Sequence, residues 1–98
     1  MTRNELLDTL NAHRTEWQAF HVKSLAVFGS FARDEATEGS DVDILVEYKP
    51  EARVGLFEFI RLQRYLSKLL GRKVDLATPE ALRKEMKPEI LREAVYAG

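Results

Sequence analysis

Three short apolar segments with strand character alternate with helix-like segments along this chain, and this order limits the fold more than any other feature. Residues 25–28 form an apolar run that ends at a glycine, residues 41–48 follow a turn, and residues 72–78 contain a third short strand. Helical patterns lie before, between and after these strands, most clearly over residues 56–70. The order predicts an α/β (α+β) domain in which a small mixed sheet of about three to four strands packs against helices. The order of the strands within the sheet does not follow from the pattern.

Capping residues indicate where the longer helices begin and end. Thr2 followed by Glu5 is typical of a capping box and predicts a first helix that continues to about residue 19. The helix over residues 56–70 is followed by Gly71, which favours a left-handed cap. We expect the aromatic residues of these two helices to pack in the core: Trp17, Phe57 and Phe59.

Prolines mark the start of two further short helices near the C-terminus. Thr78 and Pro79 have the pattern of a capping residue followed by the first helical residue. Pro88 starts a last helix that is expected to carry Val95. With these two helices, the predicted order of elements is α-β-α-β-α-β-α-α.

Composition is that of one globular domain over residues 1–98, with 45% hydrophobic and 32% charged residues. The chain has 15 basic and 16 acidic side chains, and this balance disfavours extended binding to nucleic acid. Disulfides and thiolate sites are excluded because there is no cysteine. The polar N-terminus and the lack of a long apolar run argue against a signal peptide and a membrane span, so a cytoplasmic location is expected.

Asp41 and Asp43 stand at the head of the apolar strand 41–48, where repulsion between them needs compensation. Residues two apart in a strand project from one face, with Cα atoms about 6.6 Å apart. Two charges at that distance repel by about 2–3 kcal/mol at an effective dielectric near 20. Divalent cations supply the compensation, and Mg²⁺ prefers carboxylate and phosphate oxygens. Asp75 in the third strand could complete such a site; alternatively, Asp41 is a turn residue and Asp75 an exposed strand residue.

Gly29 and Ser30 follow the first buried strand directly. A glycine at this point permits a sharp turn and a close approach of a ligand to the backbone. The Ser30 hydroxyl and the following backbone N–H groups could then face an anion at the start of a helix. No lysine follows, so this is not the phosphate loop of the GxxxxGK[ST] type. The alternative is an ordinary turn between a strand and a helix.

The two motifs together resemble a known signature. The stretch GSFARDEATEGSDVDILV, which begins at Gly29, is similar to the signature of the DNA polymerase beta-like nucleotidyltransferase superfamily. The similarity is greatest to its minimal single-domain members, the MNT-type proteins that are often paired with a HEPN-domain toxin. It covers most of the chain, and it implies the polymerase-beta-like nucleotidyltransferase fold.

The resemblance implies a role for each acidic residue of the site. Asp41 and Asp43 would hold two Mg²⁺ ions. Asp75 would be the third carboxylate, a ligand of the catalytic metal and a candidate base for the attacking hydroxyl. Ser40 would belong to the nucleotide site, where it either caps the turn before the strand or orients Asp41.

The resemblance also implies how the triphosphate is bound. Gly29 and Ser30 would contact the β- and γ-phosphates of a nucleoside triphosphate. Arg33 stands at a signature position and would act either as a nucleotide ligand or in a salt bridge to an acid such as Glu35 or Glu38.

Asp34 departs from the signature, which has a glycine after the Ala-Arg pair. Aspartate is one of the residues that tolerate a positive φ, so the fold can accommodate it. Its charge, however, would lie near a triphosphate site and could weaken nucleotide binding.

The function implied by the resemblance is that of an antitoxin enzyme. It would transfer AMP from ATP to a hydroxyl, that of a tyrosine, on a HEPN-type RNase toxin, and we expect a hetero-oligomer with that partner. One alternative is a catalytically weak binding module that neutralises the toxin by contact. Another is a small-molecule nucleotidyltransferase, although those usually carry a second domain for the acceptor.

Overall fold

A mixed four-stranded sheet forms the centre of the computed structural model, which describes residues 1–97. The strands are β1 (Val22–Phe28), β2 (Val42–Tyr48), β3 (Val74–Ala77) and β4 (Val95–Tyr96). They lie in the order β3-β2-β1-β4, where β1 is antiparallel to both β2 and β4 and β2 is parallel to β3. The predicted fold class, a small mixed sheet packed against helices, is therefore confirmed.

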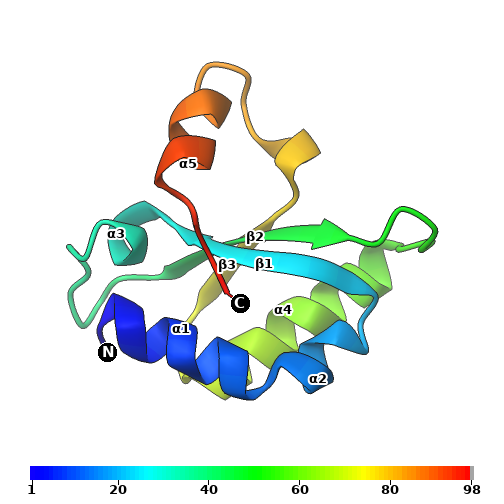
Figure 1. Cartoon of the computed structure of the whole chain (residues 1–98), viewed down its shortest axis with the longest axis horizontal. Coiled ribbons are helices and arrows are strands. Elements are labelled where there is room, and N and C mark those ends of the chain that lie inside the picture. The colour runs from blue at the N-terminus through cyan, green and yellow to red at the C-terminus, as the bar shows by residue number, and fades with distance from the viewer. Residues whose placement is uncertain (98) are drawn as a thin grey trace.

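Helices cover the sheet on both sides (Figure 1). One side carries α1 (Arg3–Ala12), α2 (Arg14–Gln18) and α4 (Leu56–Leu70). The other side carries the short 3-10 helix η1 (Pro79–Ala81) and α5 (Lys87–Glu93), while α3 (Gly29–Ala32) follows the end of β1. None of these helices has the length and apolar character that crossing a membrane requires.

Alternation along β2 separates the core from the face that bears the acids. Val42, Ile44 and Val46 are fully buried in the main core, together with side chains of α1, α2 and α4. Asp43 alternates with these residues and therefore projects from the opposite face of the sheet. That opposite face is the side covered by α5. The core thus holds β2 by one face, while Asp43 on the other face is only partly buried.

The expected caps of the two longer helices are present. The Thr2 hydroxyl accepts a hydrogen bond from the Glu5 N–H, and the Glu5 side chain accepts one from the Thr2 N–H. Gly71 ends α4 in the left-handed conformation, with a φ of 65°. By contrast, Pro79 starts only a 3-10 helix, and the Thr78 side chain makes no capping hydrogen bond.

The single helix expected through about residue 19 is wrong, because it breaks into α1 and α2 at His13. His13 has a φ of −112° and a ψ of 22°, which do not continue a helix. The carbonyl of Leu10 accepts the indole N–H of the buried Trp17 at 2.8 Å. This bond satisfies the one polar group of a large core side chain, and the break makes it possible.

Val95 was expected in the last helix, and this prediction is also wrong. The helix α5 ends at Glu93, Ala94 is extended, and Val95 lies in β4 opposite Val27 of β1. Pairing of this segment covers the open edge of β1, and a β-branched residue suits a strand.

Phe57 was expected in the core, yet 82% of its surface is exposed. Phe59, which lies two positions further along α4, packs against the core. Residues two apart point to different sides of a helix, so only one of the pair can face the sheet. Trp17 is buried as expected.

Candidate active site

Asp43 and Asp75 lie beside each other on neighbouring strands. They are register partners in the parallel pair of β2 and β3. Neighbouring strands are about 4.8 Å apart, and register partners project from the same face. The backbone N–H of Val42 donates to the carbonyl of Lys73 at 2.9 Å, which ties the start of β2 to β3. The structure therefore brings together two of the three predicted carboxylates, and Asp41 directly precedes β2.

Burial and nearby negative charges together raise the pKa of the Asp43 carboxyl. Burial is the largest cause that raises the pKa of this carboxyl, followed by the charges of Asp75 and Asp41. The positive charge of Arg33 acts in the opposite direction. The repulsion predicted for the Asp-x-Asp pair is thus present in the folded chain, and a bound cation would relieve it.

Two carboxylates that lie beside each other are a set of ligands that Mg²⁺ accepts in nucleotide-dependent sites. Within residues 1–97, no group of three or more histidine, aspartate or glutamate side chains is arranged so that it could hold a metal ion. Mg²⁺ does not need one, because it usually takes one or two carboxylates together with substrate phosphates and waters. Asp43 and Asp75 offer two such carboxylates on one face of the sheet, and Asp41 directly precedes β2. The Lys73 ammonium lies 3.8 Å from Asp41, but both side chains are largely exposed and the pair is weak.

Gly29 is required at its position for two reasons. Its φ is +72°, which side-chain-bearing residues rarely adopt. A Cβ atom built on Gly29 would overlap the carboxylate of Asp43. Phe28, the residue before it, is the register partner of Asp43 across β1 and β2. The group that lies close to this glycine in this structure is the carboxylate of Asp43, and the close approach of a ligand stays a prediction.

Arg33 is held by two carboxylates. Its Nε lies 3.3 Å from Glu35, and its Nη1 lies 3.1 Å from Glu93. The ion pair with Glu35 was one of the predicted alternatives, whereas Glu38 does not pair with Arg33. Glu93 was missed, and no local pattern could have found it, because it lies 60 residues further along the chain.

Ser40 caps the turn that leads into β2. Its hydroxyl accepts the backbone N–H of Thr37 at 2.9 Å. The Arg72 guanidinium binds the same turn and donates to the carbonyl of Glu38 at 2.9 Å. These bonds favour the capping role among the two predicted for Ser40. They also fix the loop immediately before Asp41.

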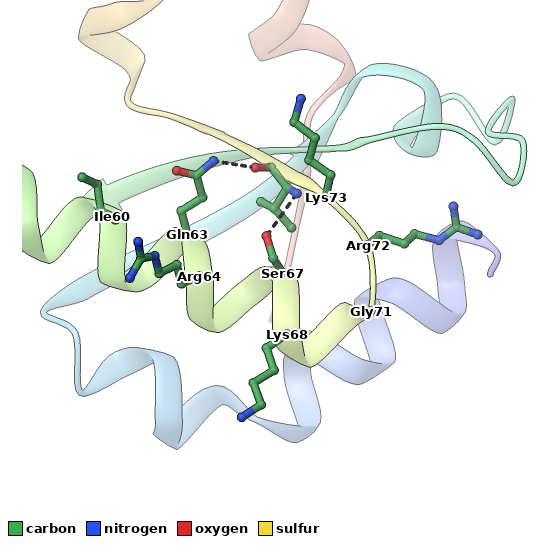
Figure 2. Close-up of a pocket in the computed structure, with 9 residues that line it drawn as sticks. Ile60, Gln63, Arg64, Ser67, Lys68, Gly71, Arg72 and Lys73 are labelled. Atoms are coloured by element: carbon green, nitrogen blue, oxygen red, sulfur yellow. Dashed lines mark hydrogen bonds between the residues drawn. The ribbon is translucent and has the colours of Figure 1, made fainter.

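Two side chains of α4 hold β3 in place, as Figure 2 shows. The Gln63 amide donates to the carbonyl of Val74 at 2.9 Å, and the Ser67 hydroxyl accepts the Val74 N–H at 3.2 Å. Because β3 is an edge strand, these bonds take the place of a further strand. Val74 directly precedes Asp75, so α4 helps to set the position of that carboxylate.

The hollow drawn in Figure 2 is separate from the carboxylates. It has a volume of about 750 Å³, is lined mainly by α4 and the start of β3, and has three exposed basic side chains along its wall: Arg64, Lys68 and Lys73. None of the three predicted metal ligands lines it. A second hollow of about 510 Å³ lies between the end of β2, η1, α5 and β4. This second hollow is partly enclosed by α5, which lies on the acidic side of the sheet.

Asp34, which replaces the signature glycine, has a φ of 59°. The position therefore does have a positive φ in this chain, which is the case in which aspartate was expected to be tolerated. One carboxylate oxygen of Asp34 accepts the Arg3 backbone N–H over a long distance of 3.5 Å. The carboxylate is thus directed at the start of α1, where the helix dipole favours a negative charge.

Comparison with known proteins decides the family. Residues 8–97 match the sequence profile of the nucleotidyltransferase domain. The chain belongs to this family. The protein adenylyltransferase MntA of Thermococcus cleftensis is 43% identical over 97 residues, a match that covers 98% of this chain and 96% of that protein.

Solved structures agree with the fold of this nucleotidyltransferase. A structure described as a minimal nucleotidyltransferase superposes with a TM-score of 0.80 at 33% identity and covers 97% of this chain and 95% of its own. A complex of a tri-AMPylated Shewanella oneidensis HEPN toxin with an MNT antitoxin contains a chain that matches at a TM-score of 0.65. That match has 14% identity, covers 94% of this chain and 71% of the other, and shows the fold alone. The family resemblance read from the signature is confirmed, and the roles of individual residues stay predictions.

Proposed function

We propose that this nucleotidyltransferase moves AMP from ATP to a tyrosine hydroxyl of a HEPN-type RNase toxin and so acts as its antitoxin. The observation that carries the proposal is the placement of Asp43 and Asp75 in register, directly beside the Gly29 turn. The name of the Thermococcus relative, a protein adenylyltransferase, supports the reaction. The complex of an AMPylated HEPN toxin with an MNT antitoxin supports the partner class.

In the proposed reaction the acceptor oxygen attacks the α-phosphorus of ATP in line. The bond between the α-phosphorus and the bridging oxygen to the β-phosphate breaks, and pyrophosphate leaves. The proton of the attacking hydroxyl passes to the carboxylate of Asp75, which is exposed and therefore accessible to an acceptor from a partner. When bound, Mg²⁺ supplies charge neutralisation on the triphosphate and lowers the pKa of the attacking hydroxyl.

Gly29 and Ser30 have different tasks in this proposal. The N–H of Gly29 already donates to Glu93 at 3.0 Å, so it is not free to donate to a phosphate. Gly29 instead allows the nucleotide to approach the backbone closely, because it has no side chain. Ser30 is next in the chain and supplies its hydroxyl and N–H to the β- and γ-phosphates. Arg33 is held between Glu35 and Glu93, which supports the ion-pair role over that of a phosphate ligand.

Labelled ATP tests the reaction. The chain is incubated with Mg²⁺, a candidate partner protein of the HEPN type and ATP labelled either at the α- or at the γ-phosphate. Label from the α-position should appear on the partner, and label from the γ-position should not. A partner with its candidate acceptor tyrosine changed to phenylalanine is the matched control and should stay unlabelled.

The same experiment separates the alternatives. A module that acts by contact alone would neutralise the toxin without ATP and leave the partner unlabelled. A small-molecule enzyme would consume ATP and release pyrophosphate only when a small hydroxyl compound is added. Either result would contradict AMP transfer to a HEPN-type protein.

A further inference from the structure

One carboxylate, that of Glu93, connects both ends of the turn that follows β1. Its Oε1 accepts the backbone N–H of Gly29 at 3.0 Å. Arg33, which ends α3, donates from Nη1 to both oxygens of Glu93, at 3.3 and 3.1 Å. The turn of residues 29–33 is therefore closed by a residue that lies 64 positions after its first member.

The Glu93 side chain that makes these contacts is mostly buried, and the fold holds it in place. The Glu93 side chain is 21% exposed, whereas Glu89 of the same helix is exposed. Directly after Glu93, the chain turns into β4, where Val95 pairs with Val27 of β1. This pairing places the end of α5 beside the end of β1. Glu93 is thus anchored within two residues of a strand that neighbours the turn.

The Gly29 N–H needs this acceptor. Gly29 follows the last residue of β1 and has a φ of +72°, so its N–H does not continue the ladder with β2. A partly buried N–H without an acceptor is costly. On its other side, Gly29 lies against the carboxylate of Asp43. Gly29 is therefore held between Asp43 and Glu93, and the direction of its peptide depends on both.

We propose that Glu93 is a positioning residue of the nucleotide site. It holds Gly29 and Arg33 so that the turn presents Ser30 to the triphosphate while leaving room for Asp43. This inference rests on the proposed function, because it assigns Glu93 to the same phosphate-binding turn. Glu93 does not touch the nucleotide; it acts through Gly29.

Three variants separate the hydrogen bond to Gly29 from the charge that pairs with Arg33. Glu93→Ala removes both contacts. Glu93→Gln keeps an oxygen that can accept the Gly29 N–H but removes the charge. Glu93→Asp keeps the charge and withdraws it by one methylene. Glu89→Ala is the matched control, because Glu89 lies on the same helix and is exposed.

The measurement is amide hydrogen exchange at Gly29 by NMR, together with titration of each full-length variant with ATP and Mg²⁺. In Glu93→Ala, exchange at Gly29 should accelerate and ATP affinity should fall, each by about tenfold or more, since a hydrogen bond to a charged acceptor is lost. Glu93→Gln should restore most of the Gly29 protection, and Glu89→Ala should match the unchanged chain. If Glu93→Ala does not fold, Glu93→Asp takes its place with the same expected direction.

Unchanged exchange at Gly29, or unchanged ATP affinity, in a folded Glu93→Ala or Glu93→Asp variant would overturn the inference. Equal loss in Glu93→Gln and Glu93→Ala would overturn it too, because a merely stabilising ion pair gives that pattern. Failure of the proposed function looks different. In that case the unchanged chain itself does not bind ATP, whereas Gly29 exchange still reports whether Glu93 holds the turn.

Discussion

Asp43 of β2 and Asp75 of β3 are register partners, and their carboxylates leave the sheet on the same face. The pKa of Asp43 is raised by burial and by the charges of Asp75 and Asp41. Without metal or nucleotide, the negative charge of Asp43 is therefore disfavoured, and a bound cation would stabilise it.

Asp75→Asn should lower the pKa of Asp43 in the metal-free protein, because it removes one of the three nearby negative charges, those of Asp75, Asp41 and Glu93, that raise this pKa. Carbon-13 NMR of the Asp43 carboxyl over an acidic titration measures the change. Glu89→Gln is the control, since Glu89 is not among the charges that act on Asp43. An Asp43 titration that is the same with and without Asp75 would contradict the placement of the two carboxylates.

Asp43→Asn should stabilise the metal-free protein at neutral pH. A raised pKa means that the folded state binds the proton more tightly than the unfolded state, so stability falls as pH rises through the raised pKa. Removing the charge should therefore add about 0.5 kcal/mol, after allowing for solvent screening of a half-exposed group, or about 2–4 °C in Tm. The difference should vanish near pH 3, where Asp43 is protonated in both states.

With Mg²⁺ and ATP added, the unchanged chain should become more stable than the Asp43→Asn variant. A ligand that binds only the folded state raises Tm, and the unchanged chain retains the carboxylate that holds the metal. Thermal unfolding with and without both ligands measures this reversal. If Mg²⁺ and ATP raise the Tm of the Asp43→Asn variant as much as that of the unchanged chain, Asp43 is not a metal ligand.

Gly29→Ala should destabilise the fold by roughly 2 kcal/mol or more, through backbone strain and overlap with Asp43. Gly71→Ala is the matched control for strain, because its φ of +65° is similar and nothing lies near its missing Cβ. It should cost about 1 kcal/mol and leave ATP binding intact. Urea unfolding and ATP titration of both variants give the comparison. Equal effects on ATP binding would show that contact with Asp43 is unimportant.

Asp34→Asn should change ATP affinity by no more than about twofold, because an exposed charge is screened by water and salt. Asn tolerates the left-handed conformation and can still accept the Arg3 N–H, so only the charge is removed. The sequence alone suggested that this charge weakens nucleotide binding. A rise in affinity of about tenfold, or 1.4 kcal/mol, would support that suggestion and contradict the orientation toward α1.

Local patterns predicted the parts of this protein that local interactions determine. The capping box at Thr2, the cap at Gly71 and the positive φ at Asp34 each depend on a few neighbouring residues. The acidic face of β2 followed from alternation along a single strand. Asp75 was a candidate partner of the Asp-x-Asp motif from the pattern of its strand, but that pattern could not show that the two strands are neighbours, because the order of the strands is a long-range property.

The failures have the same physical origin. Val95 has no partner within its own segment, and its strand forms only because the edge of β1 is open. Phe57 continues the apolar character of α4, but the direction of its side chain depends on which side of the helix meets the sheet. Glu93 reaches Gly29 through the same β1–β4 pairing, so it could not be found before the topology was known.

The most direct test of the account compares AMP transfer by the unchanged chain and by the Asp41→Ala, Asp43→Ala double variant. Both are incubated with the HEPN-type partner, Mg²⁺ and α-labelled ATP, and binding to the partner is measured in parallel. The account predicts that the double variant still binds the partner but transfers no label. Label transfer that persists in the double variant would contradict the central claim that these carboxylates form the catalytic site.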